Sequence, residues 1–574
     1  MADSISPHQS ARKDLQKWKE ALKENFYEKD SSFHHSLKMM IPDQFEDLNS
    51  SLSGYGKIVF EKLEKLVNEN DLFINNPRLE SYNEIGQKDQ KVIHHPLYNQ
   101  TGEIIYKSGM MKKMSMPGGL LPALSYFYLS SHTGEAGHHC PIACSAGIIR
   151  VLQKVPDFPK KDFFLKKLTE PSFETNFTGA QFLTEIQGGS DVGKNATLAT
   201  KDEKDAWRIH GEKWFCSNAN AELILLTARY NENVTGTKGL GLFLIPQKLE
   251  NGKNNSYTLR QLKNKIGTRA MASAEIDFEG ALAWPIGKIE DGFPIVMENV
   301  LHISRIFNTF TCLGMGKRAF QIASLYAQNR RAFGKSIDQY PLIQETLADM
   351  KVEHLALMSF IIKATSLQDK YDSDSNPSEE NKLLLRILVN LNKYISSLWS
   401  VEHIHRAIDV LGGNGAIETF SPLPRLLRDS IVCENWEGTH NTLRMQILRD
   451  IERYKIDSLF VSYLEKEIEK LSKGYQKSFR EYLLVLKNDL SWFKNQTPYD
   501  KSFFIKEITN HLSFLGMAIT LGLEATHQKE TGKGGLKEKA LDFFTNKYLR
   551  KREKLTEKGD HIRPADFQDI TRVT

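Results

Sequence analysis

Residues 183–191 read Leu-Thr-Glu-Ile-Gln-Gly-Gly-Ser-Asp (LTEIQGGSD), and the character of the sequence changes at this point. Gly188 and Gly189 allow a backbone to approach a ligand closely, because glycine has no side chain to keep the ligand away. Thr184 and Ser190 add hydroxyl groups beside the glycines. A loop of this kind is most often only a turn, so its meaning depends on the sequence around it.

The stretch that contains this loop, residues 179–289, consists of short runs rich in β-branched, aromatic and leucine residues. Asn- and Gly-rich segments separate the runs, and this pattern predicts a small all-β domain. The predicted strands are Trp207–His210, Trp214–Cys216, Leu223–Tyr230, Gly241–Pro246 and Glu275–Phe278.

The sequence on both sides of the β stretch carries apolar residues at helical spacing. Residues 1–178 predict an N-terminal helical domain, residues 290–455 a helical bundle, and residues 456–574 an additional helical region. The polar segment Tyr371–Pro377 is predicted as a loop between two bundle helices. The expected fold class is therefore mainly α with a central all-β domain, in four parts. The bundle helices are predicted at Gly292–Asn329, Leu342–Lys370, Glu379–Leu411 and Asn441–Tyr454.

Two further motifs carry chemistry. Residues 329–334 read NRRAFG, whose arginines and Phe333 could hold a pyrophosphate and its base, or could be a solvated helix end. Residues 411–415 (LGGNG) are followed by NWEGT at 435–439, which places Glu437 between an aromatic residue and a glycine. An apolar, aromatic-lined site raises the pKa of a carboxyl group and suits a general base, although a lone glutamate is more often a surface acid.

In this order, LTEIQGGSD, GEKWFCSN (211–218), NRRAFGK (329–335) and LGGNG…WEGT resemble the four signatures of the acyl-CoA dehydrogenase family, over roughly residues 90–455. The subfamily most similar to the chain is that of the long alkylation-response flavoproteins. The resemblance implies the family's α–β–α plan, FAD as cofactor and an FAD-dependent acyl-CoA dehydrogenase of fatty acid metabolism. It also implies a homodimer or homotetramer in which two chains share each FAD.

The resemblance implies Glu437 as the catalytic base that takes the α-proton, with β-hydride transfer to the flavin N5 giving a 2-enoyl-CoA. Some family members place the base one residue before the arginine near the acyl-CoA. That position is Ser304 here, which cannot act as the base, and Glu434 is a weaker candidate. The implied FAD-binding residues are Phe182, Thr184, Ser190, Phe215, Ser217, Arg330, Phe333, Gly412, Gly413, Thr439 and Asn441. The implied substrate-binding residues are Ser190, Arg305, Trp436 and Gly438.

Composition bounds the remaining choices. The 574 residues include 76 Lys and Arg against 71 Asp and Glu, a net charge of +5 that is small for a nucleic-acid-binding protein of this length. Five cysteines are too few for a disulfide scaffold, and His138, His139, Cys140 and Cys144 read as part of a packed helix and not as a metal site. No segment reads as a signal peptide or a membrane span, so the expected location is cytoplasmic.

Two alternative functions remain open at this stage. The first is a flavin- or acyl-CoA-binding regulator of the alkylation-response type that contacts DNA through residues 456–574, where 21 Lys and Arg face 17 Asp and Glu. That excess, which includes the cluster Lys547–Lys554, is typical of a solvated helix face, so DNA is not the expected partner. The second is an acyl-CoA oxidase that passes its electrons to O2. The acyl chain length and the electron acceptor, which could be a flavoprotein, are not readable from the sequence.

Overall fold

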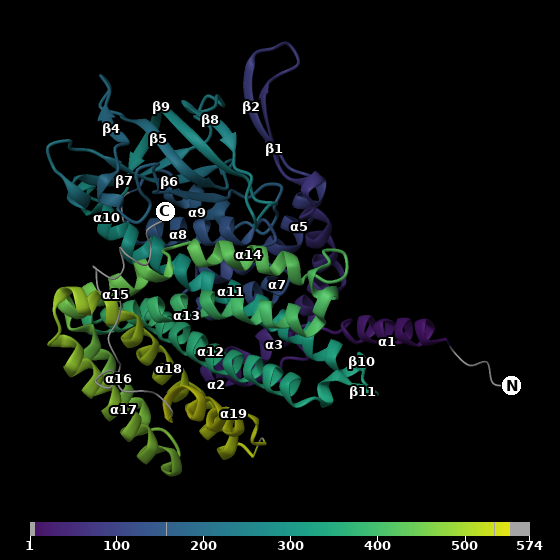
Figure 1. The fold of residues 1–574 in the computed structure, drawn as a ribbon. Coiled ribbons are helices and arrows are strands. Elements are labelled where there is room, and N and C mark those ends of the chain that lie inside the picture. The colour runs from purple at the N-terminus through teal and green to yellow at the C-terminus, as the bar shows by residue number, and fades with distance from the viewer. Residues whose placement is uncertain (1–5, 156–157, 533, 551–574) are drawn as a thin grey trace, which may run out of the picture. The chain divides into compact units, whose positions relative to one another are not determined.

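The structure is a computed structural model that describes residues 6–155, 158–532 and 534–550. The chain forms two compact units, Met1–Leu443 and Arg444–Thr574. The first unit contains a helical N-terminal part, a β domain and a helical bundle, and the second is helical (Figure 1).

The N-terminal part is built around α7, whose residues are all buried. The apolar run of α7 explains this burial, because a helix that is hydrophobic all round is stable only inside a core. The helices of this part are α1 (Pro7–Ala21), α2 (Ser31–Met40), α3 (Pro42–Ile58), α4 (Glu64–Asn70), α5 (Pro96–Lys107), α6 (Met110–Met114), α7 (Leu120–Ser131), α8 (His139–Lys154) and α9 (Lys161–Leu168).

A β-hairpin of β1 (Arg78–Tyr82) and β2 (Lys88–Ile93) interrupts these helices and projects beside the β domain (Figure 1). The Gln90 side chain exchanges two hydrogen bonds with the main chain of Leu259 and so covers part of a strand edge. The prediction of a mostly helical segment 1–178 missed this hairpin. Its strands alternate polar and half-buried residues and carry little of the apolar signal on which strand prediction depends.

The β domain is a sheet whose strands run in the order β3-β6-β4-β5-β9-β7, with β8 on β9 and a further β6–β7 pairing that closes the sheet on itself. Alanine, leucine, isoleucine and phenylalanine side chains fill its interior. The strands are β3 (Gly179–Phe182), β4 (Leu198–Lys201), β5 (Trp207–Ser217), β6 (Leu223–Arg229), β7 (Leu240–Pro246), β8 (Tyr257–Leu262) and β9 (Ser273–Pro285).

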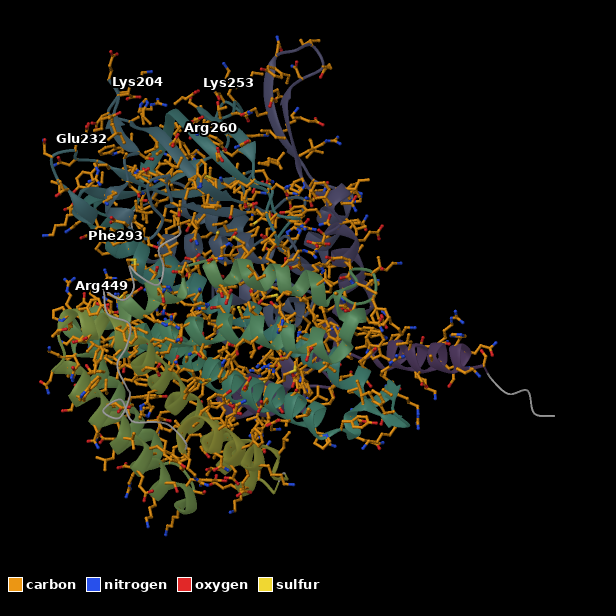
Figure 2. All side chains as sticks on the ribbon, in the orientation of Figure 1. Lys204, Glu232, Lys253, Arg260, Phe293 and Arg449 are labelled. Atoms are coloured by element: carbon orange, nitrogen blue, oxygen red, sulfur yellow. The ribbon has the colours of Figure 1, made fainter. Side chains whose placement is uncertain are left out.

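Charged side chains mark the outside of this domain. Lys204, Glu232 and Lys253 stand on its outer loops (Figure 2), and Arg260 on β8 pairs with Glu212 and Asp277. The outer face of the sheet is therefore solvated.

The helical bundle follows directly. α10 (Gly292–Ile295) and a π-helical turn (Val296–Leu301) lead into α11 (His302–Asn329), and the short hairpin β10 (Arg331–Ala332) and β11 (Lys335–Ser336) precedes α12. A shared core joins α1, α11, α13 and α14. The remaining bundle helices are α12 (Pro341–Ser373), α13 (Glu379–Leu411), α14 (Leu423–Asn435) and α15 (His440–Tyr454), the last of which runs into the second unit.

The second unit packs α16 (Ile456–Ile468), α17 (Lys473–Lys494), α18 (Pro498–Glu530) and α19 (Leu536–Thr545) around the apolar middle of α18. Buried ion pairs accompany this packing, with His511 beside Asp489 and Lys537 beside Glu524. Residues 551–554 of the predicted basic cluster lie outside the described residues.

The fold class is confirmed as mainly α with a central β-rich domain. Two strands predicted separately, Trp207–His210 and Trp214–Cys216, are one strand, and the predicted loop Tyr371–Pro377 begins too early because α12 continues to Ser373. The predicted bounds of the four parts remain predictions.

Candidate active site

Glu437 lies in the tight turn between α14 and α15, and its backbone is left-handed. Its φ is +57°, and Gly438 follows with a φ of +108°. A non-glycine residue in this conformation costs on the order of 1–3 kcal/mol and persists only where surrounding contacts impose it. Such an outlier is a reason to look for function at this residue.

The carboxylate of Glu437 is half-buried and meets the β domain. Gln181 on β3 donates a hydrogen bond from Nε2 to Glu437 Oε1 at 2.8 Å. Burial raises the pKa of Glu437 to about 7, against the lowering effects of Arg305, Lys393 and the Gln181 hydrogen bond. A carboxyl group with a pKa near 7 can exchange a proton with a bound ligand at neutral pH.

Two cations hold the main chain of the turn. Arg305 on α11 donates from Nε to the Glu437 carbonyl oxygen at 3.1 Å, and Arg305 Nη1 lies 2.5 Å from Asn390 Oδ1. Lys393 on α13 donates to the carbonyl oxygens of Glu434 at 2.9 Å and Gly438 at 2.7 Å. The left-handed turn is therefore fixed from two helices.

Ser304, at the alternative position of the base, and Glu434, the weaker candidate, have different surroundings. Ser304 is buried, and its Oγ lies 3.1 Å from Gln181 Nε2. Glu434 Oε1 lies 3.0 Å from His440 Nε2. Glu437 is thus the carboxylate that the turn and the sheet together position.

The β domain presents an aromatic wall through an irregularity in β5. Lys213 pairs with Ile276 and Cys216 with Ala274, so β5 has one more residue than β9 across this step, which is a β-bulge. The bulge frees Trp214 N–H to donate to the Thr184 carbonyl oxygen at 3.0 Å. It also turns Phe215 outward, with 53% of its surface exposed.

The other predicted residues of the wall differ in exposure. Thr184 and Ser217 are half-buried, and Ser217 Oγ lies 3.4 Å from Ser273 Oγ. Phe182 is completely buried in the core of the β domain. A ligand could therefore meet Phe182 only at its main chain.

The LTEIQGGSD loop is anchored by a buried ion pair. Glu185 Oε1 lies 2.6 Å from Lys213 Nζ, and Glu185 also accepts hydrogen bonds from the main chain of Ala196 and Thr197. These contacts hold both ends of the loop. Ser190 is thereby presented on the surface, where its Oγ lies 3.2 Å from Thr442 Oγ1.

Thr442 joins this loop to the residues after Glu437, because its hydroxyl also lies 3.0 Å from Thr439 Oγ1. The three hydroxyls gather at the N-terminus of α15, where main-chain N–H groups and the helix dipole favour an anion. The exposed Asn441 lies in the first turn of the same helix. This corner has the chemistry of a phosphate site.

A separate group of predicted residues lies at the far end of the bundle from the sheet, on the β10–β11 hairpin and the turn after α13 (Figure 1). Phe333 is 96% exposed at a φ of +50°, and Arg330 directly follows α11. Gly412 and Gly413 border open space, since an added Cβ would meet nothing within 4 Å. The structure does not bring these residues together with Thr184 or Glu437.

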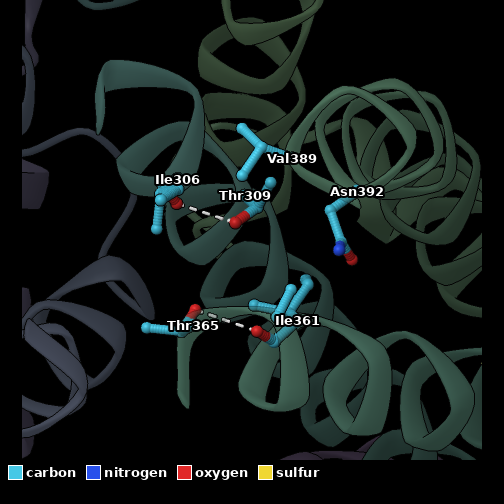
Figure 3. Close-up of a pocket in the computed structure, with 7 residues that line it drawn as sticks. Ile306, Thr309, Ile361, Thr365, Val389 and Asn392 are labelled. Atoms are coloured by element: carbon cyan, nitrogen blue, oxygen red, sulfur yellow. Dashed lines mark hydrogen bonds between the residues drawn. The ribbon is translucent and has the colours of Figure 1, made fainter. Parts of the chain in front are cut away.

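A small cavity lies inside the bundle between α11, α12 and α13 (Figure 3). Thr309 and Thr365 donate their hydroxyl protons to carbonyl oxygens within their own helices, so they add little polarity to the wall. The full lining is Ile306, Thr309, Ile361, Ala364, Thr365, Val389 and Asn392. Ile306 directly follows Arg305 in the sequence, and Val389 directly precedes Asn390.

His138 and His139 are core residues. His138 Nε2 lies 2.8 Å from the Tyr98 carbonyl oxygen, and His139 Nε2 lies 2.9 Å from Ser130 Oγ. Burial lowers the pKa of both imidazoles to about 3, so both are neutral at physiological pH. Within the described ranges, no helix is long and apolar enough to cross a bilayer.

Sequence reasoning missed Gln181, Asn390 and Lys393. Gln181 directly precedes the predicted Phe182, but nothing in its own surroundings marks it. Asn390 and Lys393 lie in the middle of a long helix, where a polar residue normally faces solvent. Only the packing of α13 against the turn reveals them.

Comparisons with known proteins match two parts of the chain to one family. The family description "Acyl-CoA dehydrogenase, middle domain" matches residues 180–281, and "Acyl-CoA dehydrogenase, C-terminal domain" matches residues 290–452. Acyl-CoA dehydrogenase family member 11 of Caenorhabditis elegans is 29% identical over 441 residues, which make up 74% of this chain and 70% of that protein. AidB of Escherichia coli K12 is 26% identical over 457 residues, or 77% of this chain and 80% of that one.

Among solved structures, Caenorhabditis elegans ACDH-11 in complex with C11-CoA is similar to the chain. It has a TM-score of 0.85 and 25% sequence identity, and the match covers 92% of each chain. The likeness therefore extends beyond the two matched family domains.

Proposed function

Since this chain belongs to the acyl-CoA dehydrogenase family and is thus an FAD-dependent oxidoreductase, we propose that it oxidises acyl-CoA thioesters between Cα and Cβ with Glu437 as the base. The observation that carries the proposal is the half-buried Glu437 carboxylate on a strained turn that Arg305 and Lys393 hold. A pKa of about 7 leaves this carboxylate ionised in a large fraction of molecules at neutral pH and still basic enough to accept a proton.

The base acts on a weak acid. A thioester α-proton becomes removable only if the negative charge that develops on the carbonyl oxygen is stabilised. The main-chain N–H of Glu437 is the proposed donor to that oxygen, and Arg305 fixes the following peptide through the Glu437 carbonyl oxygen. Glu437 then takes the α-proton, and the electron pair of the Cα–H bond forms the Cα=Cβ double bond of a 2-enoyl-CoA as the hydride leaves Cβ.

The residues present fit FAD. The exposed Phe215 ring, the hydroxyls of Thr184 and Ser217 and the anion-favouring corner at Ser190 and Thr439 offer a flat apolar surface, polar partners and a phosphate site. FAD supplies, when bound, the acceptor for the hydride. Phe182 would contribute through its main chain only.

A second copy of the chain is proposed to complete the cofactor site. Arg330, Phe333, Gly412 and Gly413 match cofactor positions of the family but belong to the β10–β11 hairpin and the turn after α13, away from β5, which carries Phe215 (Figure 1). An almost fully exposed phenylalanine at positive φ is costly for an isolated chain and is explained if it inserts beside a cofactor held by a neighbour. The proposed assembly is thus a homodimer or a dimer of dimers.

The proposed substrate is an acyl-CoA, and the experiment that tests the proposal also determines the length of its acyl chain. The purified flavoprotein should be titrated anaerobically with acyl-CoAs of increasing length, with bleaching of the oxidised flavin band as the readout. Bleaching by at least one acyl-CoA, with 2-enoyl-CoA as product, is expected. A flavin-free protein, or a flavin that no acyl-CoA bleaches, would remove the proposal. Parallel assays of peroxide and of an artificial acceptor then separate an oxidase from a dehydrogenase.

A further inference from the structure

Lys393 differs from the other buried lysines of the described residues. Three of these lysines pair with a carboxylate: Lys213 with Glu185, Lys317 with Asp30 and Lys537 with Glu524. Lys393 is completely buried and, within the part of the chain that the structure describes, has no carboxylate at ion-pair distance. Its ammonium donates instead to the carbonyl oxygens of Glu434 and Gly438.

An ammonium group in this position is costly. Moving it out of water is unfavourable unless hydrogen bonds and an opposite charge compensate. Burial lowers the pKa of Lys393 to about 8, so the charged form still dominates at neutral pH. A methionine of similar length would avoid this cost, which suggests that the charge serves a purpose at this place.

The two carbonyl groups that Lys393 binds stand on either side of Glu437 in the sequence. Arg305 binds the carbonyl of Glu437 itself at 3.1 Å. The contacts of Lys393 therefore span the two left-handed residues, Glu437 and Gly438. An unrestrained chain would not keep these residues in that backbone conformation.

The charged and titratable groups that act on Lys393 come from α11, α14 and the turn. Arg305 and Cys312 face it from α11, Cys433 from α14 and Glu437 from the turn. Arg305 is a cation, and the hydrogen bond with Cys312 and burial raise the pKa of the Cys433 thiol well above its usual range. Glu437 is the carboxylate among these groups. Its negative charge therefore compensates the Lys393 ammonium, although the two groups do not form an ion pair.

We propose that Lys393 is a positioning residue for Glu437, whose ammonium holds the main chain on both sides of the base and supplies the buried positive charge that its carboxylate balances. This inference rests on the proposed function. Lys393 acts through the turn and does not touch the substrate.

Two substitutions separate the hydrogen bonds from the charge. Lys393→Met removes both, and Lys393→Gln keeps amide donors without the charge. At saturating acyl-CoA, Lys393→Met is expected to slow flavin reduction roughly 10- to 100-fold, the size of effect that misplacing a catalytic group causes, while the Kd for acyl-CoA stays within threefold. In Lys393→Gln, flavin reduction is expected to be about tenfold slower than in wild type. The acidic limb of its pH profile should move to higher pH.

The second readout is amide hydrogen exchange of residues 436–443 in the flavin-free protein. Lys393→Met should lose protection there, and Lys393→Gln should keep most of it. Lys317→Met removes a paired lysine from the same bundle and is the control: its melting temperature should fall, while the reduction rate of its folded, flavin-loaded form stays within twofold of wild type.

Several outcomes would overturn the inference. Reduction rates of Lys393→Met within twofold of wild type would do so, as would unchanged exchange in residues 436–443 or an equal loss in Lys317→Met. A wild-type rate in Lys393→Gln would refute the role of the charge. If Lys393→Met does not fold, the reduction rate of Lys393→Gln is the deciding measurement. If no acyl-CoA reduces the wild-type flavin, the proposed function fails, and the exchange measurement still tests the hold of Lys393 on the turn.

Discussion

Gln181 Nε2 lies 2.8 Å from Glu437 Oε1, so an amide of the β domain holds the carboxylate of the helical bundle. The two residues are 256 positions apart in the chain. The state of the base thus depends on contacts from two different parts of the fold.

Removing the Gln181 amide should raise the pKa of Glu437. Gln181→Leu takes away a hydrogen bond that lowers the pKa of Glu437, so that pKa should rise. A hydrogen bond to a charged group contributes about 1.5–3 kcal/mol, which corresponds to a rise on the order of one pH unit. The measurement is the pH dependence of flavin reduction, whose acidic limb should move upward. Ser304→Ala keeps the Gln181–Glu437 bond and should leave the limb in place; equal shifts in both variants would argue against this role of Gln181.

Neutralising the base should abolish proton transfer. Glu437→Gln is expected to lower the rate of flavin reduction by roughly 10²- to 10⁴-fold, the usual contribution of a general base, without loss of bound flavin. Glu434→Gln, three residues earlier at the end of α14, is the matched control and should keep most of its activity. Stopped-flow reduction by one acyl-CoA compares them. Similar losses in both variants would assign the proton transfer elsewhere.

The same substitution should change how stability depends on pH. The pKa of Glu437 is raised from 4.5 to about 7, so between these values the unfolded chain releases the proton while the folded chain keeps it. The stabilising contribution is complete below about pH 4.5, is lost as pH rises to about 7 and is constant above. Relative to wild type, Glu437→Gln should gain up to about 3 kcal/mol in free energy of unfolding between pH 4.5 and 7. Denaturant unfolding at pH 5 and pH 8 measures this gain, and a constant difference would contradict it.

Breaking the loop anchor should release the cofactor. Lys213→Met leaves Glu185 buried and unpaired, a change that typically costs 3–5 kcal/mol, and frees the loop that carries Thr184 and Ser190. The expected results are a lower melting temperature and substoichiometric flavin. Lys201→Met breaks the exposed pair with Asp205, which is worth less than about 1 kcal/mol, and should change neither quantity. Full flavin content in Lys213→Met would show that the pair is not needed for binding.

Removing the exposed ring at Phe333 should weaken assembly. Phe333→Ala costs a single chain little, because the side chain is 96% exposed, but it should reduce flavin content and molar mass if a neighbour's cofactor receives the ring. Light scattering and flavin absorbance measure these quantities. Ile74, which is 87% exposed, provides the control Ile74→Ala. Unchanged mass and flavin in Phe333→Ala would refute a shared site.

The family and the fold class could be predicted from the sequence, because each motif combines residue types that are rare together. The order of LTEIQGGSD, KWFCSN, NRRAFG and WEGT predicted the family, and the two matched family domains confirm it. The long bundle helices were also predicted within a few residues, because their apolar periodicity is sustained over several turns.

Features set by tertiary packing could not be predicted. The β1–β2 hairpin has weak apolar alternation, and the polar residues Gln181 and Lys393 gain their meaning only from the turn they meet. Most predicted site residues still lie near Glu437 or on the β wall. The exceptions, such as Arg330 and Phe333, lie apart from them, and both their cofactor roles and the second chain proposed to complete the site remain predictions.

The bulge in β5 makes the ligand wall depend on the number of residues in the strand. In a regular strand every second side chain points inward, but here Lys213 and Cys216, three positions apart, both do. Deleting one residue between them would restore even pairing with β9 and leave one side chain, where there are now two, between the inward-facing pair. Point substitutions can therefore change the chemistry of the wall, whereas a single-codon deletion changes how many side chains the strand presents to it.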